Sequence, residues 1–552
     1  MQNFMNQRSF FVIFISLIAF GLGDSSIAQQ LNHKFPHVSI QQSWLKRWQT
    51  SIVHVLAKAD LIQADLTPEQ IVQIRQLNPN ATILPFWSVR ENKSPSEWWR
   101  RDIVDGFRND GFDGMYVDLW NDQSREEASI RSAELRNWWP DGIHIVNYGT
   151  VFDYSYELNG FMWEDFVAGN VASVLKGQGG RGHDDWVDHG HKPTITILND
   201  RLIEGINSTK FDFLKKGRYA TGISMLRDEI YVMYNFGSGG SPHWASNWWL
   251  DEFDFDIGEP MGEAKTIDEC VDRWGKVKSC VWAREFTNGL VIVNDSGEPR
   301  TITSSQLASN GLNGPFWRFR GGQDPVLNNG SVFDSVILHG WIYLPETRWW
   351  QSGDAILLGK SPQTVVTDII IDDESSDVRN PYIRENIGGT FTHSGFSYNL
   401  DCGADPPEEY ECSGPQFPGS WGSHPDYSSH FAGPGSGSNT ARWVPTIGLA
   451  GKYEIYEWHS SQPNGNATDA PFKIRSADGE TSVSVDQSVN GGRWNRLGVF
   501  TFQAGQSGFV EVTNKANGLV IADALKFVYR DSDFVADSSP PNPPKGVKVD
   551  GK

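Results

Sequence analysis

The sequence predicts an α/β fold, a (β/α)8 TIM barrel with a β-rich appendage, followed by a C-terminal β-sandwich domain. Three observations predict it. In residues 29–264, short apolar runs alternate with longer amphipathic ones, the pattern of repeated βα units around a parallel sheet. Residues 265–360 alternate like strands and contain the hairpin signal Asn288-Gly289. Residues 365–530 are rich in Gly, Ser and strand formers such as "KYEIYEW", as expected of a β-sandwich.

Eight apolar runs predict the strands of the barrel, and eight such strands favour a closed (β/α)8 arrangement. They lie at 38–40, 60–65, 81–87, 114–118, 143–148, 160–164, 194–198 and 230–235. The segment "LTPEQIVQIRQLNPN" predicts the helix after the second strand. It has Thr67 as its cap, Pro68 at the first helical position and Gln70 three residues after the cap, which together make a capping box.

Both ends of the chain are predicted to lie outside these domains. Residues 1–28 hold Arg8, an apolar run at 10–22 and small residues up to Ala28, the layout of a secretory signal peptide. The run is short for spanning a bilayer, so we expect no membrane span after cleavage and a secreted location, extracellular or periplasmic. Residues 531–552 are Pro-rich and predict a disordered tail.

Charge and composition narrow the class of partner. The formal net charge of -21 repels phosphate backbones and anionic membrane surfaces, so we expect no nucleic-acid partner. The 23 Trp residues favour carbohydrate, because aromatic faces stack on sugar rings, although buried Trp accounts for many of them. We expect a monomer that acts on a polysaccharide or oligosaccharide.

The four cysteines form two close pairs in the sequence, Cys270 with Cys280 and Cys402 with Cys412. In an exported protein this spacing predicts two local disulfides. Neither pair has the close spacing or the neighbouring His residues of a zinc site.

Two carboxylates are the catalytic candidates. Reacting groups of (β/α)8 enzymes lie at the C-terminal ends of strands, where Asp118 ends the fourth strand and Glu164 the sixth. Along "GMYVDLW", Asp118 shares its side with Tyr116, whereas the residues between them are apolar and suit the helix layer. Asp118 is therefore expected to face the barrel interior. An alternative is that one or both acids only hydrogen-bond loop backbone.

A pair of acids suffices for glycoside hydrolysis, with no cofactor and no metal. One carboxylic acid protonates the leaving oxygen, and one carboxylate attacks the sugar or activates water. We assign Glu164 as acid/base, because Trp163 and Phe166 would help to raise its pKa, and Asp118 as nucleophile or base.

Other polar and aromatic residues at or near the strand ends are candidates for contacting substrate, although each singly is more often a cap or a packing residue. They are Asp65, Trp87, Trp120, Asn147, Tyr148, Asp200 and Asn235. Trp120 also occupies the position of the catalytic Glu in chitinase-like barrels, which disfavours a chitinase mechanism.

Two clusters resemble metal sites but are better explained otherwise. "GHDDWVDHGH" at 182–191 precedes the seventh strand, so it belongs to the face opposite the expected mouth, and we interpret it as a polar surface loop. The acids at 372–377 lack the spacing of a known calcium loop.

Four ordered segments of the first 358 residues resemble a known family. "GFDGMYVDLWND", "LNGFMWEDF", "WWLDEFDFDIGEPMGEA" and "AREFTNGLVIVND" are similar to the secreted barrel proteins grouped as hypothetical glycoside hydrolases, type 15. This resemblance covers about 38–358 and implies hydrolysis of sugar bonds. It establishes neither the substrate nor the catalytic residues.

The C-terminal part resembles the golvesin or xanthan-lyase type of binding module. "TARWVPTIGLAGKYEIYEWHS", "VSVDQSVNGGRWNRLGVFTF" and "VIADALKFVY" carry this likeness, which implies attachment to polysaccharides or cell surfaces. An exposed set of Trp443, Trp458 and Trp494 would make a sugar platform, although Trp in a sandwich more often lies in the core.

The sequence thus predicts a secreted glycoside hydrolase with an accessory carbohydrate- or surface-binding module. The alternative is a non-catalytic glycan-binding or surface-attachment protein on a barrel scaffold, since fold does not dictate function. A polysaccharide lyase would need Tyr, His or Lys converging beside an acidic sugar, and no such set is visible in the sequence.

Overall fold

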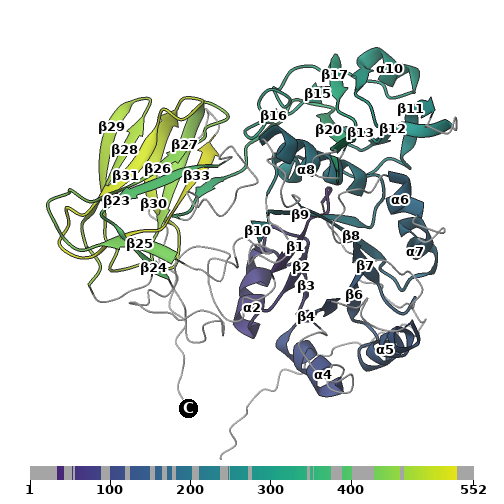
Figure 1. Ribbon diagram of the computed structural model, residues 1–552, viewed down its shortest axis with the longest axis horizontal. Coiled ribbons are helices and arrows are strands. Elements are labelled where there is room, and N and C mark those ends of the chain that lie inside the picture. Colours follow the sequence, from purple (N-terminus) through teal and green to yellow (C-terminus); the bar gives the residue numbers. More distant parts are fainter. Residues whose placement is uncertain are drawn as a thin grey trace, which may run out of the picture.

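The computed structural model describes most of the chain between residues 34 and 530 (Figure 1). The described residues are 34–42, 53, 56–88, 100–118, 125–148, 156–163, 171–176, 182–201, 210–236, 246–247, 249–271, 277–344, 349–351, 353–373, 388–400, 428–460 and 465–530. The expected signal peptide, the expected tail, Trp120, Glu164, Cys402 and Cys412 lie outside them.

The first part of the chain, here called the βα region (residues 34–254), alternates strands and helices around two parallel sheets. One sheet has the order β1-β2-β3 and the other the order β10-β9-β8-β7-β6-β5-β4, with β10 antiparallel to β9. The strands are β1 (Ser39–Gln42), β2 (Leu61–Ala64), β3 (Thr82–Leu84), β4 (Phe86–Ser88), β5 (Gly114–Asp118), β6 (Ile143–Tyr148), β7 (Gly160–Trp163), β8 (Ile195–Arg201), β9 (Ile230–Phe236) and β10 (Ser246–Asn247).

Backbone contacts link the two sheets at both ends. A parallel bridge joins Val38, just before β1, to Val232 in β9. At the other end only Pro85 separates β3 from β4, and it interrupts the expected strand because proline has no N–H for the ladder. The neighbouring segment bonds to both sides of this break, since Asp113 N donates to Ile83 O (2.8 Å) and Tyr116 N donates to Pro85 O (3.2 Å).

Helices connect most of these strands. They are α2 (Pro68–Leu77), α4 (Arg101–Asp110), α5 (Arg125–Trp138), α6 (Val171–Lys176), α7 (His183–His189), α8 (Lys210–Ser224) and α9 (Asp251–Asp254). The predicted capping box on α2 is confirmed: Thr67 Oγ1 accepts from Gln70 N, and Gln70 Oε1 accepts from Thr67 N. In the described part of the chain, no helix is both long enough and apolar enough to cross a bilayer.

The strands have an inner and an outer apolar side, as the period of two predicts. Tyr116 of β5 packs in an inner cluster built only from strand residues, with Met162 of β7 among them. Its neighbours Met115 and Val117 pack in an outer cluster that includes helix residues such as Ile74. The predicted assignment of sides along β5 is confirmed.

Residues 265–365 form a β-rich appendage on α8. Its elements are β11 (Lys265–Val271), β12 (Val277–Glu285), β13 (Gly289–Asn294), β14 (Arg300–Thr303), α10 (Ser304–Ser309), β15 (Trp317–Arg318), β16 (Arg320–Gly321), β17 (Ser335–Leu338), β18 (Ile342–Leu344), β19 (Trp349–Gln351), β20 (Asp354–Gly359) and β21 (Thr364–Val365). The expected disulfide Cys270–Cys280 is present between β11 and β12, with a Cα–Cα distance of 5.8 Å. The predicted hairpin turn at Asn288-Gly289 joins β12 to β13.

Residues 369–530, here called the C-terminal module, contain antiparallel sheets with the orders β22-β33-β27-β30, β23-β26-β31-β28-β29 and β24-β25-β32. The strands are β22 (Ile369–Ile371), β23 (Gly389–Ser394), β24 (Ser397–Leu400), β25 (Ser428–Ala432), β26 (Thr440–Pro445), β27 (Gly451–Trp458), β28 (Ala470–Ser476), β29 (Gly479–Val485), β30 (Asn495–Phe502), β31 (Phe509–Thr513), β32 (Val520–Ala522) and β33 (Ala524–Arg530). The first two sheets share one core, in which Tyr453 and Phe527 of one sheet meet Trp443 and Phe472 of the other.

A buried carboxylate joins the three parts. Asp251 of α9 is fully buried, and its Oδ2 accepts from the backbone N–H groups of Gly322 and Gln323 in the appendage, both at 2.7 Å. Its Oδ1 accepts from Thr367 N (3.0 Å), in the segment that leads to the C-terminal module. The βα region, the appendage and the start of the module are therefore tied at one side chain.

Replacing Asp251 should destabilise the whole molecule. Asp251→Ala leaves three backbone N–H groups without their acceptor, and we expect the free energy of unfolding to fall by about 3 kcal/mol or more. Urea unfolding followed by Trp fluorescence measures this change, with Asp256→Ala at an exposed position as the control. Equal midpoints for the two variants would contradict the role of Asp251.

The neighbouring Glu252 predicts a pH dependence. Burial raises its pKa to about 7, with Arg218 opposing the rise and Asp251 adding to it. The folded state therefore holds this proton more tightly than the unfolded chain does. The resulting stabilisation is complete below the unfolded pKa and is lost as the pH rises through about 7.

We expect Glu252→Gln, which resembles the neutral acid, to be more stable than the wild type above pH 7, by about 2 to 3 kcal/mol. The difference should vanish near pH 4. Thermal unfolding across this pH range measures it, with the exposed Glu263→Gln as the control. A pH-independent difference would show that Glu252 is ionised in the folded protein.

Candidate active site

Asp118 and Asn147 form the polar pair at the C-terminal ends of β5 and β6. Asn147 Nδ2 donates to Asp118 Oδ1 at 2.7 Å, and Asn147 is only 7% exposed whereas Asp118 is partly exposed. The two strands are parallel neighbours, so their C-terminal ends meet at one edge of the sheet. The amide thereby fixes the orientation of the carboxylate.

This pair lies on the inner side of the strands. Asp118 follows Tyr116 by two residues, and Asn147 follows Ile145 by two, and both Tyr116 and Ile145 belong to the inner cluster. In that cluster the Tyr116 hydroxyl contacts Met162 Sδ at 3.5 Å. Met162 also precedes Glu164 by two positions, although Glu164 itself lies outside the described residues.

The other candidates at the strand ends are only partly placed. Asp65 directly follows β2 and is partly exposed. The backbones of Tyr148, Asp200 and Asn235 lie near the C-terminal ends of β6, β8 and β9, with Asp200 opposite Tyr234. Their side chains fall outside the described part of the structure. Among the described side chains, Asp118 and Asn147 are thus the predicted residues that contact each other directly.

Trp87 lies on the opposite side of the sheet from the inner cluster, which corrects the prediction that it contacts substrate. Its ring packs edge-on against Phe107 of α4, with 5.8 Å between ring centroids, and it joins the outer cluster. The reason is the alternation along β4, since Phe86 packs with the inner cluster and the next residue must face the helices. Trp87 is a packing residue between sheet and helix.

The segment at 182–191 is also corrected, because most of it is the helix α7 rather than a loop. His183 is fully buried there, with its Nδ1 3.0 Å from Thr196 Oγ1. Burial lowers the pKa of His183 to about 3, with Arg227 and Lys192 adding to the shift. His183 is therefore a neutral packing residue at neutral pH.

Two of the three expected platform residues of the C-terminal module are buried. Trp443 and Trp458 are each 1% exposed, and only Trp494 is partly exposed. Trp443 faces the shared core because β26 alternates, and its Nε1 donates to Asp523 O at 3.2 Å. Trp458 packs against Trp494, with ring centroids 5.3 Å apart. The prediction of an exposed platform of three Trp residues is therefore wrong.

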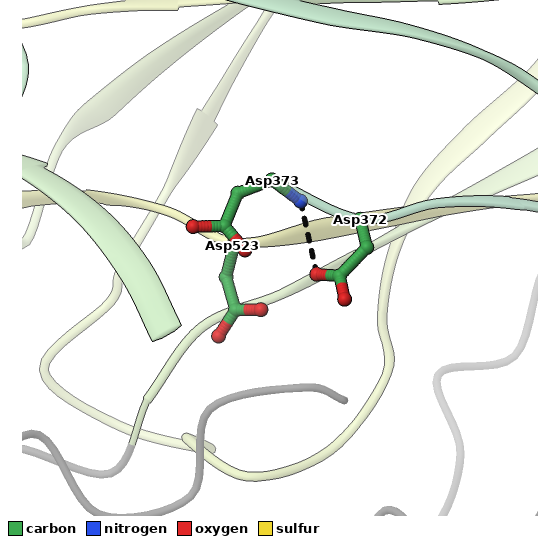
Figure 2. Close-up of side chains that lie close together, drawn as sticks. All are labelled: Asp372, Asp373 and Asp523. Atoms are coloured by element: carbon green, nitrogen blue, oxygen red, sulfur yellow. Dashed lines mark hydrogen bonds between the residues drawn. The ribbon is translucent and has the colours of Figure 1, made fainter. Parts of the chain in front are cut away.

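Three aspartates gather in the C-terminal module, as Figure 2 shows. The carboxylates of Asp372, Asp373 and Asp523 offer oxygens that lie within 4.8 Å of one another. Asp373 and Asp523 are buried, and His430 Nδ1 lies 2.7 Å from Asp373 Oδ2. Such oxygens could supply part of the six to eight ligands that Ca²⁺ takes. Asp523 was missed from the sequence because it lies far along the chain, between β32 and β33, although an acid between two strand runs is a visible signal.

Comparison with known proteins finds similarity over the C-terminal part of the chain. A family profile described as Golvesin C-terminal domain matches residues 416–529. The chain is 36% identical over 105 residues to xanthan lyase of Bacillus sp. (strain GL1), a match that covers 18% of this chain and 11% of the relative. It is 32% identical over 117 residues to golvesin of Dictyostelium discoideum, covering 19% of this chain and 20% of the relative. The C-terminal resemblance is confirmed.

Solved structures of carbohydrate-active enzymes show weaker similarity. A Paenibacillus xanthan lyase matches 53% of this chain and 28% of its own, at 17% identity and a TM-score of 0.23. AmyP in complex with maltose matches 62% of this chain and 99% of its own, at 9% identity and a TM-score of 0.34. Scores this low carry no argument about fold or activity. The likeness of residues 38–358 to the type 15 hydrolases stays a prediction.

The burial of Trp443 can be tested against that of Trp494. We expect Trp443→Ala to lower the free energy of unfolding by about 3 to 5 kcal/mol, and the partly exposed Trp494→Ala to cost clearly less. Differential scanning calorimetry of the two variants measures the contrast. An unchanged melting temperature for Trp443→Ala would place its ring at the surface after all.

Proposed function

We propose that this protein is a secreted glycoside hydrolase that cleaves a polysaccharide, with the C-terminal module as its binding accessory. The observation that carries the proposal is the position of Asp118. It is an acid at the C-terminal edge of a parallel sheet, on the inner side, oriented by Asn147. That edge is where α/β enzymes place reacting groups.

The proposal includes a closed (β/α)8 barrel. In support, the bridge from Val38 to Val232 joins the residue before β1 to β9. The segment around β5 bonds to Ile83 of β3 and to Pro85, and β5 pairs with β4. The inner cluster draws its residues from strands of both sheets, as the interior of a barrel would. The type 15 resemblance of the sequence implies the same architecture.

Asp118 and Glu164 are the proposed carboxylate pair. Glu164 would directly follow β7, which is separated from β5 only by β6. Glu164 protonates the glycosidic oxygen as the bond to the anomeric carbon breaks, and Asp118 attacks that carbon or takes a proton from the attacking water. The hydrogen bond from Asn147 orients the Asp118 carboxylate for this step. We propose Asp65, Trp120, Tyr148, Asp200 and Asn235 as substrate contacts around the pair.

Export and attachment complete the proposal. The expected signal peptide at 1–28 would send a monomeric protein out of the cell. The segment similar to golvesin and xanthan lyase would then hold the enzyme to its polysaccharide or to a surface.

A second function has one observation in its favour. The family profile matches residues 416–529, and xanthan lyase and golvesin each match over less than a fifth of this chain. This fits a protein whose role is attachment and whose βα region performs no catalysis. Such a protein would bind glycan without cleaving it.

A screen of the full chain against a panel of polysaccharides, scored by new reducing ends, separates the two functions. We expect Asp118→Asn and Glu164→Gln each to lower the cleavage rate about 100-fold or more, because each removes one proton-transfer or attacking group. Asp110→Asn, an exposed acid at the end of α4, is the control.

Full activity in either variant would remove that residue from the mechanism. Binding without cleavage by the wild type, across the panel, would favour the attachment protein.

A further inference from the structure

One face of the sheet β22-β33-β27-β30 gathers positive charge. Tyr453 of β27 packs in the module core, so Lys452 and Tyr456 stand on the opposite side of the strand. The register places Arg530 beside Lys452, and Arg496 and Lys526 on the two sides of Tyr456.

Glu454 is the acid in the middle of this face. It accepts from Arg496 through Oε1 and from Arg530 through Oε2. Burial raises its pKa, but the hydrogen bonds from both guanidinium groups outweigh this, and the pKa of Glu454 is lowered. Glu454 is therefore ionised at neutral pH. Among the described residues of β27, β30 and β33 on this face, four cations and one carboxylate leave three positive charges.

Two aromatic rings share the same face. Lys526 Nζ lies 5.0 Å from the centre of the Tyr456 ring and 4.9 Å from that of Trp494. Both rings are partly exposed, and Trp494 makes an edge-type contact with the buried Trp458. Aromatic faces of this kind stack on sugar rings, while an adjacent cation recognises a negative substituent. Arg496 is 43% exposed at its side chain, so it is within reach of a ligand.

The charges around Lys526 come from more than one part of the molecule. The pKa of Lys526 is lowered first by burial, while Asp368 attracts its charge and Lys58 of the βα region and Arg530 repel it. Lys58 itself lies over the Trp249 ring at 5.3 Å. Cations of the module and of the βα region, together with the acid Asp368, thus surround Lys526.

We infer that this face, with Tyr456, Trp494, Lys526 and Arg496 at its centre, binds a polysaccharide whose sugars carry carboxylates. The inference rests on the proposed accessory role of the module and names its ligand class. A chain of net charge -21 has gathered cations where its aromatic rings are exposed, which gives charge complementarity to an acidic glycan. A guanidinium binds a carboxylate through paired, charge-assisted N–H donors, whereas the hydroxyl groups of a neutral glycan are weaker acceptors for them.

The opposite sheet supplies a matched control. There Glu511 is held by Arg442 and by Lys473, the latter at 2.9 Å, so a single acid again sits between two cations. The Phe509 ring lies under the Arg442 guanidinium on this sheet. Arg475 of β28 lies opposite Glu480 of the neighbouring strand β29. Arg496→Gln and Lys473→Gln therefore make the same change of charge, and each leaves the acid one cationic partner, but on opposite faces.

Affinity electrophoresis of the full chain tests the inference, with polygalacturonate or neutral amylose in the gel. We expect Arg496→Gln and Trp494→Ala to weaken binding to polygalacturonate about tenfold each, and Lys473→Gln to leave it unchanged within about twofold. Binding of the wild type should also weaken as salt is raised from 0.05 to 0.5 M. The melting temperatures of all three variants show whether each is folded. If Trp494→Ala is unfolded, Arg496→Gln alone still tests the inference.

Several results would overturn the inference. Equal losses in Arg496→Gln and Lys473→Gln would mean that net charge alone acts. Single-stranded DNA serves as a second anionic probe. If Arg496→Gln and Trp494→Ala lost as much affinity for this DNA as for polygalacturonate, the face would bind anions without selectivity. Binding of amylose but not polygalacturonate would refute the acidic ligand and leave the accessory role intact, whereas binding of neither would refute the ligand class and count against the accessory role.

Discussion

The Asp251 carboxylate is the constraint on which the arrangement of the three parts depends. A carboxylate without partners cannot be buried at acceptable cost, so its position requires the three N–H groups that it accepts. Those donors lie 71, 72 and 116 residues further along the chain. The loop at Gly322 and the segment at Thr367 must therefore both be folded before Asp251 can be buried, which couples the βα region to everything that follows it.

The same junction brings backbones into direct contact. A Cβ on Gly448 of the C-terminal module would lie 1.5 Å from the carbonyl oxygen of Gly322, so only glycine allows this approach. A crevice beside this contact is lined by residues of the appendage, the connecting segment and the module, including Gln323, Ile370 and Tyr453. Figure 1 shows the module beside the βα region and the appendage, with β27 and β33 on the side toward them. The C-terminal module therefore packs directly against the rest of the chain, in addition to being joined to it by the connecting segment.

Local patterns predicted the parts of the structure that depend on neighbours in sequence. The capping box of α2 and the inward position of Tyr116, two residues before Asp118, follow from spacings of three and two residues, and both are confirmed. The burial of Trp443 was not predictable in this way, because either side of a strand in a two-sheet module can hold an aromatic residue, and tertiary packing decides between them. Asp251 escaped detection for a different reason, since its partners are distant backbone groups that no side-chain pattern marks.

The net negative charge of the protein explains why a fixed position of the C-terminal module would matter to the proposed reaction. A protein of net charge -21 repels an acidic polymer at long range, and an acid such as Asp118 at the reaction site adds to that repulsion. The proposed binding face on the module would offset this locally and would hold one stretch of polymer in place. Binding of a second stretch then becomes intramolecular, with an effective concentration set by the distance between the two sites. Because Asp251 and the Gly448 contact tie the module to the rest of the chain, that distance would vary little. A polymer bound at Lys526 and Arg496 would then be presented at a constant distance from the edge that carries Asp118.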